Sequence, residues 1–258
     1  APGFGGINLE DIAAPRCFEI ERRLRETLDI PVFHDDQHGT AIVVLAALTN
    51  AMRVVQKDLT QVRVVVAGAG AAGSAIVRLL LAAGVTDIVM WDREGCLSAD
   101  DESLSPAKAE LAALTNRRRV RGDLHAALTG ADVFIGVSGP GVLQAQWIAD
   151  MAEQAVVFAL ANPEPEVDPA EADRYAAVVA SGRSDYPNQI NNVLAFPGVF
   201  RGLLDARVHE ITTDMLLRAA TAIAHVLRDD ELNPSFIIPT VFHPDVAKAV
   251  AAAIRGDS

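Results

Sequence analysis

The sequence has few cysteines and no surplus of positive charge. Its 258 residues include two cysteines, Cys17 and Cys96, without CxxC spacing, which excludes a disulfide framework and fits a reducing, cytoplasmic location. The formal net charge of −12 argues against a nucleic-acid-binding surface, which requires a basic patch. The one basic run, residues 117–121, is expected to be a solvated face.

Long hydrophobic runs are also missing. No apolar stretch approaches about 18 residues without polar interruption, so neither a membrane span nor a signal peptide is expected. Apolar residues make up 50% and charged residues 22% of the chain, which is typical of a soluble globular protein. The chain begins with alanine and its first motif follows almost at once, so we expect a fragment or a processed protein.

The stretch from Val62 to Asp92 contains a strand, a glycine turn and a helix in succession. The β-prone run 62–67 leads into Gly68-Ala69-Gly70-Ala71-Ala72-Gly73, and the helix-forming run 74–83 follows directly. A second apolar run, 87–91, ends in Asp92, nineteen residues after the last of these glycines. This order and spacing predict a dinucleotide site.

Each part of this motif has an expected role. Gly68 makes the tight turn, Gly70 lets the backbone approach a pyrophosphate, and Gly73 lets helix and strand pack closely. The helix N-terminus offers unpaired N–H groups and a partial positive charge to the phosphates. Asp92 is placed to accept hydrogen bonds from a ribose. The alternative is a purely structural turn, because glycines also terminate strands.

Acidic residues gather in two places before this motif. Glu10 and Asp11 stand beside apolar neighbours, and Asp35 and Asp36 follow a short expected strand, 30–33. Three carboxylates with open positions suit Mg²⁺ or Mn²⁺, so a third ligand from the second pair would complete a metal site. The structural alternative makes the first pair charges at a helix N-terminus and gives the second pair a capping role. For that cap, Thr40 is the better candidate.

Small or polar residues follow three later expected strands. Ser138 begins a Ser-Gly-Pro-Gly turn, Asn162 follows strand 155–161, and the polar loop 181–192 follows strand 178–180. Small residues at the carboxyl end of a strand leave room for a cofactor, so we expect these loops to line one cleft. For the last loop, the alternative is an ordinary surface loop rich in Asx turns.

The alternation of strands and helices predicts an α/β fold, a Rossmann-like, doubly wound and mostly parallel sheet with helices on both faces. The expected helices cover residues 16–27, 41–55, 74–83, 106–115, 123–128, 199–205, 213–227 and 244–254, and the expected strands cover 30–33, 62–67, 87–91, 133–137, 155–161 and 178–180. We divide one dinucleotide-binding unit into a metal-site segment (1–58), a Rossmann core (59–207) and C-terminal helices (208–258).

Several segments, in order, resemble the nicotinamide-binding part of bacterial malic enzymes. They are FGGINLEDI at 4–12, PVFHDDQHGTA at 31–41, the GAGAAG turn, FIGVS at 134–138, ANP at 161–163 and GRSDYPNQINNVLAFPGVF at 182–200. The similarity covers essentially the whole chain, and several unrelated motifs in order are more specific than any one of them. The resemblance implies oxidative decarboxylation of L-malate to pyruvate and CO₂ with a divalent metal and NAD(P). Such Lewis-acid chemistry needs no covalent intermediate.

The resemblance also implies roles for individual residues. It makes Glu10, Asp11 and Asp36 the metal ligands, and Asp35 the active-site acid that acts in or supports proton transfer. Amides that hold the substrate carboxylate correspond to Asn162, Asn191 and Asn192. The cofactor-binding positions are Gly68, Ala69, Gly70, Ala71, Ala72, Gly73, Asp92, Ser138 and Asn162.

One part of the family's pattern is missing. The family's general-base lysine and its acid tyrosine come from an N-terminal region, and no tyrosine or lysine of this chain lies in a matching context. We therefore expect that region to be supplied in cis or in trans, and the isolated chain to bind nucleotide and metal but turn over malate poorly. The resemblance further implies a homo-oligomer.

The expected cofactor is NAD, with NADP as the alternative. Asp92 disfavours a 2′-phosphate and Glu94 adds negative charge, whereas Arg93 offers a guanidinium that pairs with phosphate. Three other functions stay open: malolactic conversion, a metal-independent Rossmann oxidoreductase, and a nucleotide-binding module without catalysis. The metal-independent enzyme would have no use for the three acids together.

Overall fold

A six-stranded sheet forms the centre of the protein, which the computed structural model describes over residues 3–256. Its strand order is β5-β4-β3-β6-β7-β8. All neighbouring strands are parallel except β5, which pairs antiparallel with β4. The strands are β3 (Arg63–Ala67), β4 (Asp87–Asp92), β5 (Gly95–Cys96), β6 (Val133–Gly136), β7 (Val156–Ala159) and β8 (Val178–Ser181). The predicted α/β fold with a mostly parallel sheet is confirmed.

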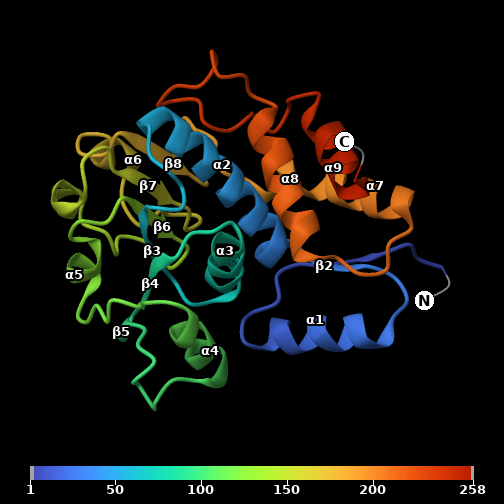
Figure 1. The fold of residues 1–258 in the computed structure, drawn as a ribbon, viewed down its shortest axis with the longest axis horizontal. Helices are drawn as coiled ribbons and strands as arrows, with labels where there is room; N and C mark the ends of the chain where they lie inside the picture. The colour runs from blue at the N-terminus through green and yellow to red at the C-terminus, as the bar shows by residue number, and fades with distance from the viewer. Residues whose placement is uncertain (1–2, 257–258) are drawn as a thin grey trace.

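Alternate residues of each strand enter two different hydrophobic cores, as the two-residue period of a strand requires. Val64 and Val66 of β3 pack with α2, α3 and α8, whereas Val65 and Ala67 pack with α5 and α6. Figure 1 accordingly shows α5 and α6 on the opposite side of the sheet from α2 and α8. These helices are α2 (Thr40–Val55), α3 (Ala71–Ala82), α5 (Leu124–Leu128), α6 (Pro169–Ala172) and α8 (Thr213–His225).

The N-terminal segment forms a second, small sheet. Its strands β1 (Ile7–Leu9) and β2 (Val32–His34) are parallel and are connected through α1 (Arg16–Thr27). Figure 1 shows α1 at one end of the molecule, below β2. After β2 the chain enters one π-helical turn, η1 (Asp35–Gly39), which runs directly into α2.

The remaining elements are helices and short helical turns. The last helix, α9, packs against α7 and α8. These elements are α4 (Pro106–Leu114), η2 (Ala145–Asp150), η3 (Asn192–Leu194), α7 (Phe196–Ala206) and α9 (Val246–Arg255). Sequence patterns predicted the long helices and the core strands to within a few residues. They missed β1, β5, α6 and η2, which are too short to show a period.

The prediction that Thr40 is a helix cap is wrong. Its dihedral angles, φ −61° and ψ −45°, are helical, because the turn from Asp35 to Gly39 continues into α2 without a break. The helical segment therefore begins at Asp35, and no side chain caps it there. Neither Asp35 nor Asp36 has the capping role that was the structural alternative.

This helical segment is long and apolar. Asp35–Val55 has the length and hydropathy of a membrane span, but its apolar stretch of 18 residues is 72% buried inside the fold. It packs against α3 and α8. The composition of α2 is therefore explained by its place in the core, as expected of a helix that is hydrophobic on all sides.

Candidate active site

The site lies where the connections leave the sheet in opposite directions. From β3 the chain crosses through α3 to β4 on one side, and the later strands β6, β7 and β8 lie on the other side of β3. In open α/β sheets, such a switch point leaves a crevice at the carboxyl ends of the two central strands. Here these ends are held together where the Val137 N–H donates to the carbonyl of Ala67 at 2.9 Å.

The glycines after β3 differ in what surrounds them. Gly68 has φ +116°, and a Cβ there would lie 2.5 Å from the Val137 carbonyl oxygen. A Cβ on Gly73 would lie 1.8 Å from the carbonyl oxygen of Gly68, so α3 packs directly on the turn. A Cβ on Gly70 would meet nothing within 4 Å. The turn and the close packing thus need two of the glycines, while Gly70 faces open space, as an approaching ligand requires.

A cavity of about 670 Å³ extends from this turn to the end of β4. It brings together the glycine turn, Asp92 and Ser138, which are predicted cofactor residues. Arg93 and Lys108 also line it. The cavity thus runs from the N-terminus of α3 to an acid at the end of the next strand, which is where Rossmann folds bind a dinucleotide.

Lys108 of α4 is a site residue that the sequence did not reveal. Its Nζ lies 2.6 Å from Asp92 Oδ2 and 3.1 Å from Glu94 Oε2. The hydrogen bond to Asp92, partly opposed by burial, raises the pKa of Lys108. A charged ammonium therefore neutralises the acid that would hold a ribose. The residues are too far apart in the sequence for any local period to connect them.

A second cavity, of about 500 Å³, adjoins the first and shares residues 137–140 with it. It lies over the carboxyl ends of β6, β7 and β8. The predicted site residues that line it are Asp36, Ala72, Ser138, Asn162, Asn191 and Asn192. The structure thus places the expected substrate amides, one expected metal ligand and the nicotinamide-side serine in one cleft.

Asp35 is buried beside this cleft at the start of the π-helical turn. Its Oδ2 accepts a hydrogen bond from Asn192 Nδ2 at 2.7 Å. A Cβ on Gly39 would lie 2.1 Å from Asp35 Oδ1, so this glycine makes room for the carboxylate. Burial, together with the nearby charges of Glu10 and Asp36, raises the pKa of Asp35 from 3.8 to about 6. Such a carboxyl group exchanges its proton near neutral pH, as an acid–base group must.

The three expected metal ligands are near one another but do not form a closed set. The backbone N–H of Asp11 donates to Asp36 Oδ2 at 2.8 Å, and Asp11 has a left-handed φ of 56°. Glu10 Oε2 accepts a weak bond from Asn8 at 3.4 Å. Over residues 3–256, no three His, Cys, Asp or Glu side chains are close enough together to hold a metal ion. The three carboxylates are therefore not already gathered around one cation position. Their role as ligands of a single metal ion is a proposal.

Helix α1 supports the turn that carries the acids. Glu21 is buried, and its two carboxylate oxygens contact the side chains of the turn, one His38 Nε2 at 2.6 Å and the other Gln37 Nε2 at 2.9 Å. These two bonds hold Gln37 and His38 of the turn, while Asp36 lines the cleft. Sequence patterns showed Glu21 only as part of an amphipathic helix, and its partner residues were not predicted.

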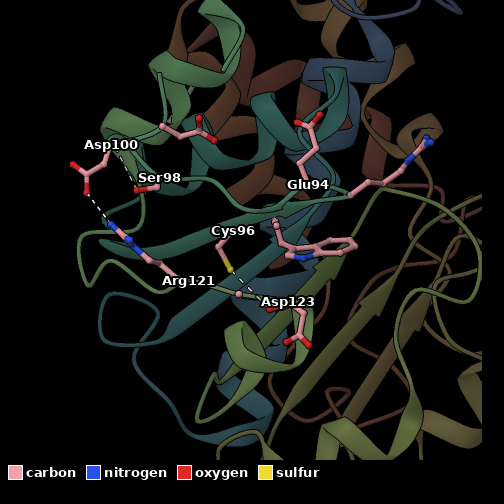
Figure 2. Close-up of a pocket in the computed structure, with 11 residues that line it drawn as sticks. Glu94, Cys96, Ser98, Asp100, Arg121 and Asp123 are labelled. Atoms are coloured by element: carbon pink, nitrogen blue, oxygen red, sulfur yellow. Dashed lines mark hydrogen bonds and ion pairs between the residues drawn. The ribbon is translucent and has the colours of Figure 1, made fainter. Parts of the chain in front are cut away.

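A further cavity, of about 510 Å³, lies outside the switch point at the β4–β5 edge. Figure 2 shows an ion pair in this cavity, with Arg121 directed at Asp100, 3.5 Å away. Cys96 Sγ lies 3.9 Å from the Asp123 carbonyl oxygen. None of the predicted site residues lines this cavity, so the candidate site is the double cleft over the central strands.

Known proteins are similar to this chain in sequence and in fold. The NAD-dependent malic enzyme of Geobacillus stearothermophilus is 57% identical over 98% of this chain and 53% of that protein. The bifunctional malic/malolactic enzyme of Bacillus subtilis is 50% identical over 98% of this chain and 62% of that protein. The crystal structure of the NAD-dependent malic enzyme of Thermotoga maritima superposes with a TM-score of 0.95 at 50% identity, covering all of this chain and 68% of that one.

The chain thus spans 53% and 62% of the lengths of these two relatives. Its match to a protein family is nearly as long as the chain itself. Residues 37–257 match the family described as Malic enzyme, NAD binding domain, and with these identities the chain belongs to the malic enzyme family.

Proposed function

We propose that this chain supplies the dinucleotide, metal and substrate-carboxylate sites for the oxidative decarboxylation of L-malate to pyruvate and CO₂. The observation that carries the proposal is the double cleft, because one continuous surface contains the glycine turn and Asp92 as well as Asp36 and three asparagines. A dinucleotide module without catalysis would need only the first half of this surface.

The dinucleotide half works through fixed groups. The N-terminus of α3 presents backbone N–H groups and a partial positive charge to a pyrophosphate, and the open space at Gly70 allows close approach. Asp92 accepts from the ribose, while Ser138 lines the wall that the two cavities share. These residues bind and orient the cofactor.

The substrate half offers amides. The side-chain carbonyl of Asn191 accepts the Val193 N–H at 3.0 Å. The side-chain NH₂ group of Asn191 is therefore the part that can donate to a substrate carboxylate. Asn192 uses its own NH₂ group to hold Asp35. Asn162, at the exposed end of β7, completes the set. With its raised pKa, Asp35 holds or releases a proton at its carboxyl oxygen beside this pocket, where it contacts Asn192.

The donor chemistry around Asp35 fits a hard divalent cation. Asp35 Oδ1 is buried without a hydrogen-bond partner, and the charges of Glu10 and Asp36 both act on this carboxyl group. A concentration of carboxylate oxygens is what Mg²⁺ or Mn²⁺ binds. Glu10, Asp11 and Asp36 would hold the cation. A cation held there would supply Lewis-acid stabilisation of the oxygen at C2 of malate and of the charge left by CO₂, and a bound nicotinamide would supply a hydride acceptor.

The residue types that line the substrate half of the cleft restrict the roles that this chain can have in catalysis. Neither a lysine nor a tyrosine is among the residues that line its substrate half. The proposal therefore assigns binding, orientation and the Asp35 proton to this chain, and no proton transfer by a lysine–tyrosine pair. We further propose NAD as the preferred cofactor, because Asp92 and Glu94 oppose a 2′-phosphate. A cytoplasmic location fits the two free cysteines.

A coupled binding titration tests the proposal. NAD and NADP are titrated separately into the 258-residue chain in three conditions, alone, with Mn²⁺, and with Mn²⁺ plus malate, and a further control adds malate without any divalent cation. Trp91 lines the dinucleotide cavity and is one of two tryptophans, so its fluorescence reports binding. We expect NAD to bind more tightly than NADP, and Mn²⁺ with malate to tighten NAD at least about fivefold, a coupling of ~1 kcal/mol.

Each outcome has a distinct meaning. Equal NAD affinity in all three conditions would reduce the protein to a nucleotide-binding module. Tighter binding with malate in the absence of any divalent cation would remove the metal from the proposal. Malolactic conversion, which the name of the Bacillus subtilis relative includes, is distinguished by analysing whether lactate or pyruvate forms in the full-length protein.

A further inference from the structure

A buried carboxylate joins two loops that line the substrate half of the cleft. Glu166 is completely buried. Its Oε1 accepts the backbone N–H of Ser138 at 2.8 Å, and its Oε2 accepts the backbone N–H of Ala161 at 3.0 Å. Ser138 follows β6 and Ala161 follows β7, so one side chain bridges the ends of two neighbouring strands.

The surroundings of Glu166 are shaped for this bridge. A Cβ on Gly136, the last residue of β6, would lie 2.4 Å from Glu166 Cδ, so only glycine leaves room for the carboxylate. The backbone supports the same arrangement, because the carbonyl of Glu166 accepts the Leu143 N–H at 3.0 Å. The segment around Glu166 is therefore bonded to both ends of the loop that begins at Ser138.

Burying a carboxylate is costly unless hydrogen bonds compensate it. Burial raises the pKa of Glu166, and the bonds from Ala161 and Ser138 act against that rise. An apolar side chain of similar size would fill the space without this cost but would leave two backbone donors without their acceptor. A glutamine would offer one oxygen and place an NH₂ group against the other donor.

We propose that Glu166 is a positioning residue of the dinucleotide and substrate site, whose carboxylate sets the spacing between the Ser138 loop and the Ala161–Asn162 loop. The inference rests on the proposed function. Ser138 and Asn162 both line the substrate half of the cleft, and Asn162 directly follows the residue that Glu166 binds. Glu166 itself lines neither half, so it acts through the two loops.

The test compares Glu166→Gln with a matched control, Asp132→Asn. Asp132 is also a bridging carboxylate, since it accepts the Arg63 N–H at 2.8 Å and pairs with Lys57 Nζ at 2.7 Å. It precedes β6, so its bridge lies at the opposite end of the strands from the cleft. Both variants lose one carboxylate bridge, and only one of them changes the wall of the site.

Three readouts separate positioning from general stability. They are the unfolding midpoint, the NAD affinity with Mn²⁺ and malate, and amide hydrogen exchange at Ser138 and Ala161 followed by NMR. We expect E166Q to weaken NAD binding at least about fivefold and to speed exchange at one of the two amides about tenfold or more. D132N should lower the unfolding midpoint by a similar amount while leaving NAD affinity within about twofold.

Equal losses of NAD affinity in the two variants would make Glu166 a merely structural residue and overturn the proposal. Unchanged exchange at both amides in E166Q would do the same. If E166Q does not fold, hydrogen exchange in the wild-type chain provides the test. The backbone amides of Ser138 and Ala161 should then be protected to a similar degree, and clearly different protection of the two amides would overturn the bridge. If the wild type binds no dinucleotide, the proposed function fails, while the exchange data still test the bridge separately.

Discussion

Asn192 and Asp35 are 157 positions apart, yet the side-chain NH₂ of Asn192 lies 2.7 Å from Asp35 Oδ2. The bond joins the π-helical turn after β2 to the polar loop after β8. Because Asp35 is also close to Glu10 and Asp36, this pair connects the metal-site segment with the substrate amides. Four experiments follow from this region and from the dinucleotide turn beside it.

The first concerns the pH dependence of stability. The folded chain holds the Asp35 proton more tightly than the unfolded chain, because burial and neighbouring acids raise its pKa from 3.8 to about 6. This contribution to stability is fully present below about pH 4 and is lost as the pH rises through about 6. We expect Asp35→Asn to remove that loss, which amounts to at most about 3 kcal/mol.

Urea unfolding of the metal-free chain between about pH 4 and pH 7 measures the effect. Asn at position 35 can still accept the bond from Asn192, so the comparison isolates the charge. Asp173→Asn, at an exposed position, serves as the control and should leave the wild-type pH dependence intact. Parallel stability curves for wild type and D35N would contradict the prediction.

The second compares two glycines of one turn. Gly73→Ala places a Cβ 1.8 Å from the Gly68 carbonyl oxygen, so we expect a loss of stability of about 2 kcal/mol or more. Gly70→Ala meets nothing within 4 Å and has φ −86°, so its stability should match the wild type. Its methyl group instead occupies the path of the pyrophosphate and should weaken NAD binding about tenfold or more. Thermal unfolding with NAD titration checks both, and loss of stability in G70A would refute the assignment.

The third concerns the choice between NAD and NADP. Lys108 pairs with Asp92 at 2.6 Å and with Glu94 at 3.1 Å, so it lowers the negative charge that opposes a 2′-phosphate. Lys108→Ala leaves both acids uncompensated, and we expect the preference for NAD over NADP to rise about tenfold, or ~1.4 kcal/mol. Lys248→Ala, on the exposed surface of α9, is the control. A fall in NAD preference in K108A would show that the lysine supports Asp92 instead.

The fourth concerns the metal. Asp36→Asn retains an oxygen for the Asp11 N–H, which now bonds to Asp36 Oδ2 at 2.8 Å, but removes a negative charge. We expect Mn²⁺ affinity, measured by electron paramagnetic resonance, to fall about tenfold or more. Stability without metal should not fall, because Asp36 is one of the charges acting on Asp35. Unchanged Mn²⁺ affinity would remove Asp36 from the ligand set.

Sequence patterns were sufficient for much of this protein because the information is local. The helix Arg16–Thr27 was predicted with the same bounds that the structure shows, since its apolar stripe and its opening proline lie within one segment. The run from Val62 to Asp92 contains its own strand, turn and helix. A glycine spacing and a two-residue strand period need no knowledge of distant residues.

The contacts that decide the site are not local. Lys108 reaches Asp92, Glu21 reaches His38, and Glu166 reaches Ser138 only because the folded chain brings their elements together. A salt bridge or a buried carboxylate leaves no period in the sequence, so none of these partners was predictable. The same applies to the wrong cap at Thr40, where the π-helical turn removed the helix start that the residue type suggested.

By itself, the sequence determined the parallel α/β architecture, the glycine turn and the resemblance to the malic enzymes, because backbone propensities and motif spacings are written along the chain. Only the tertiary structure decided which charges meet, which carboxyl group is buried and which loops are held together. The physical reason is that burial and electrostatic pairing depend on distances across the sheet, and these exist only after the chain has folded.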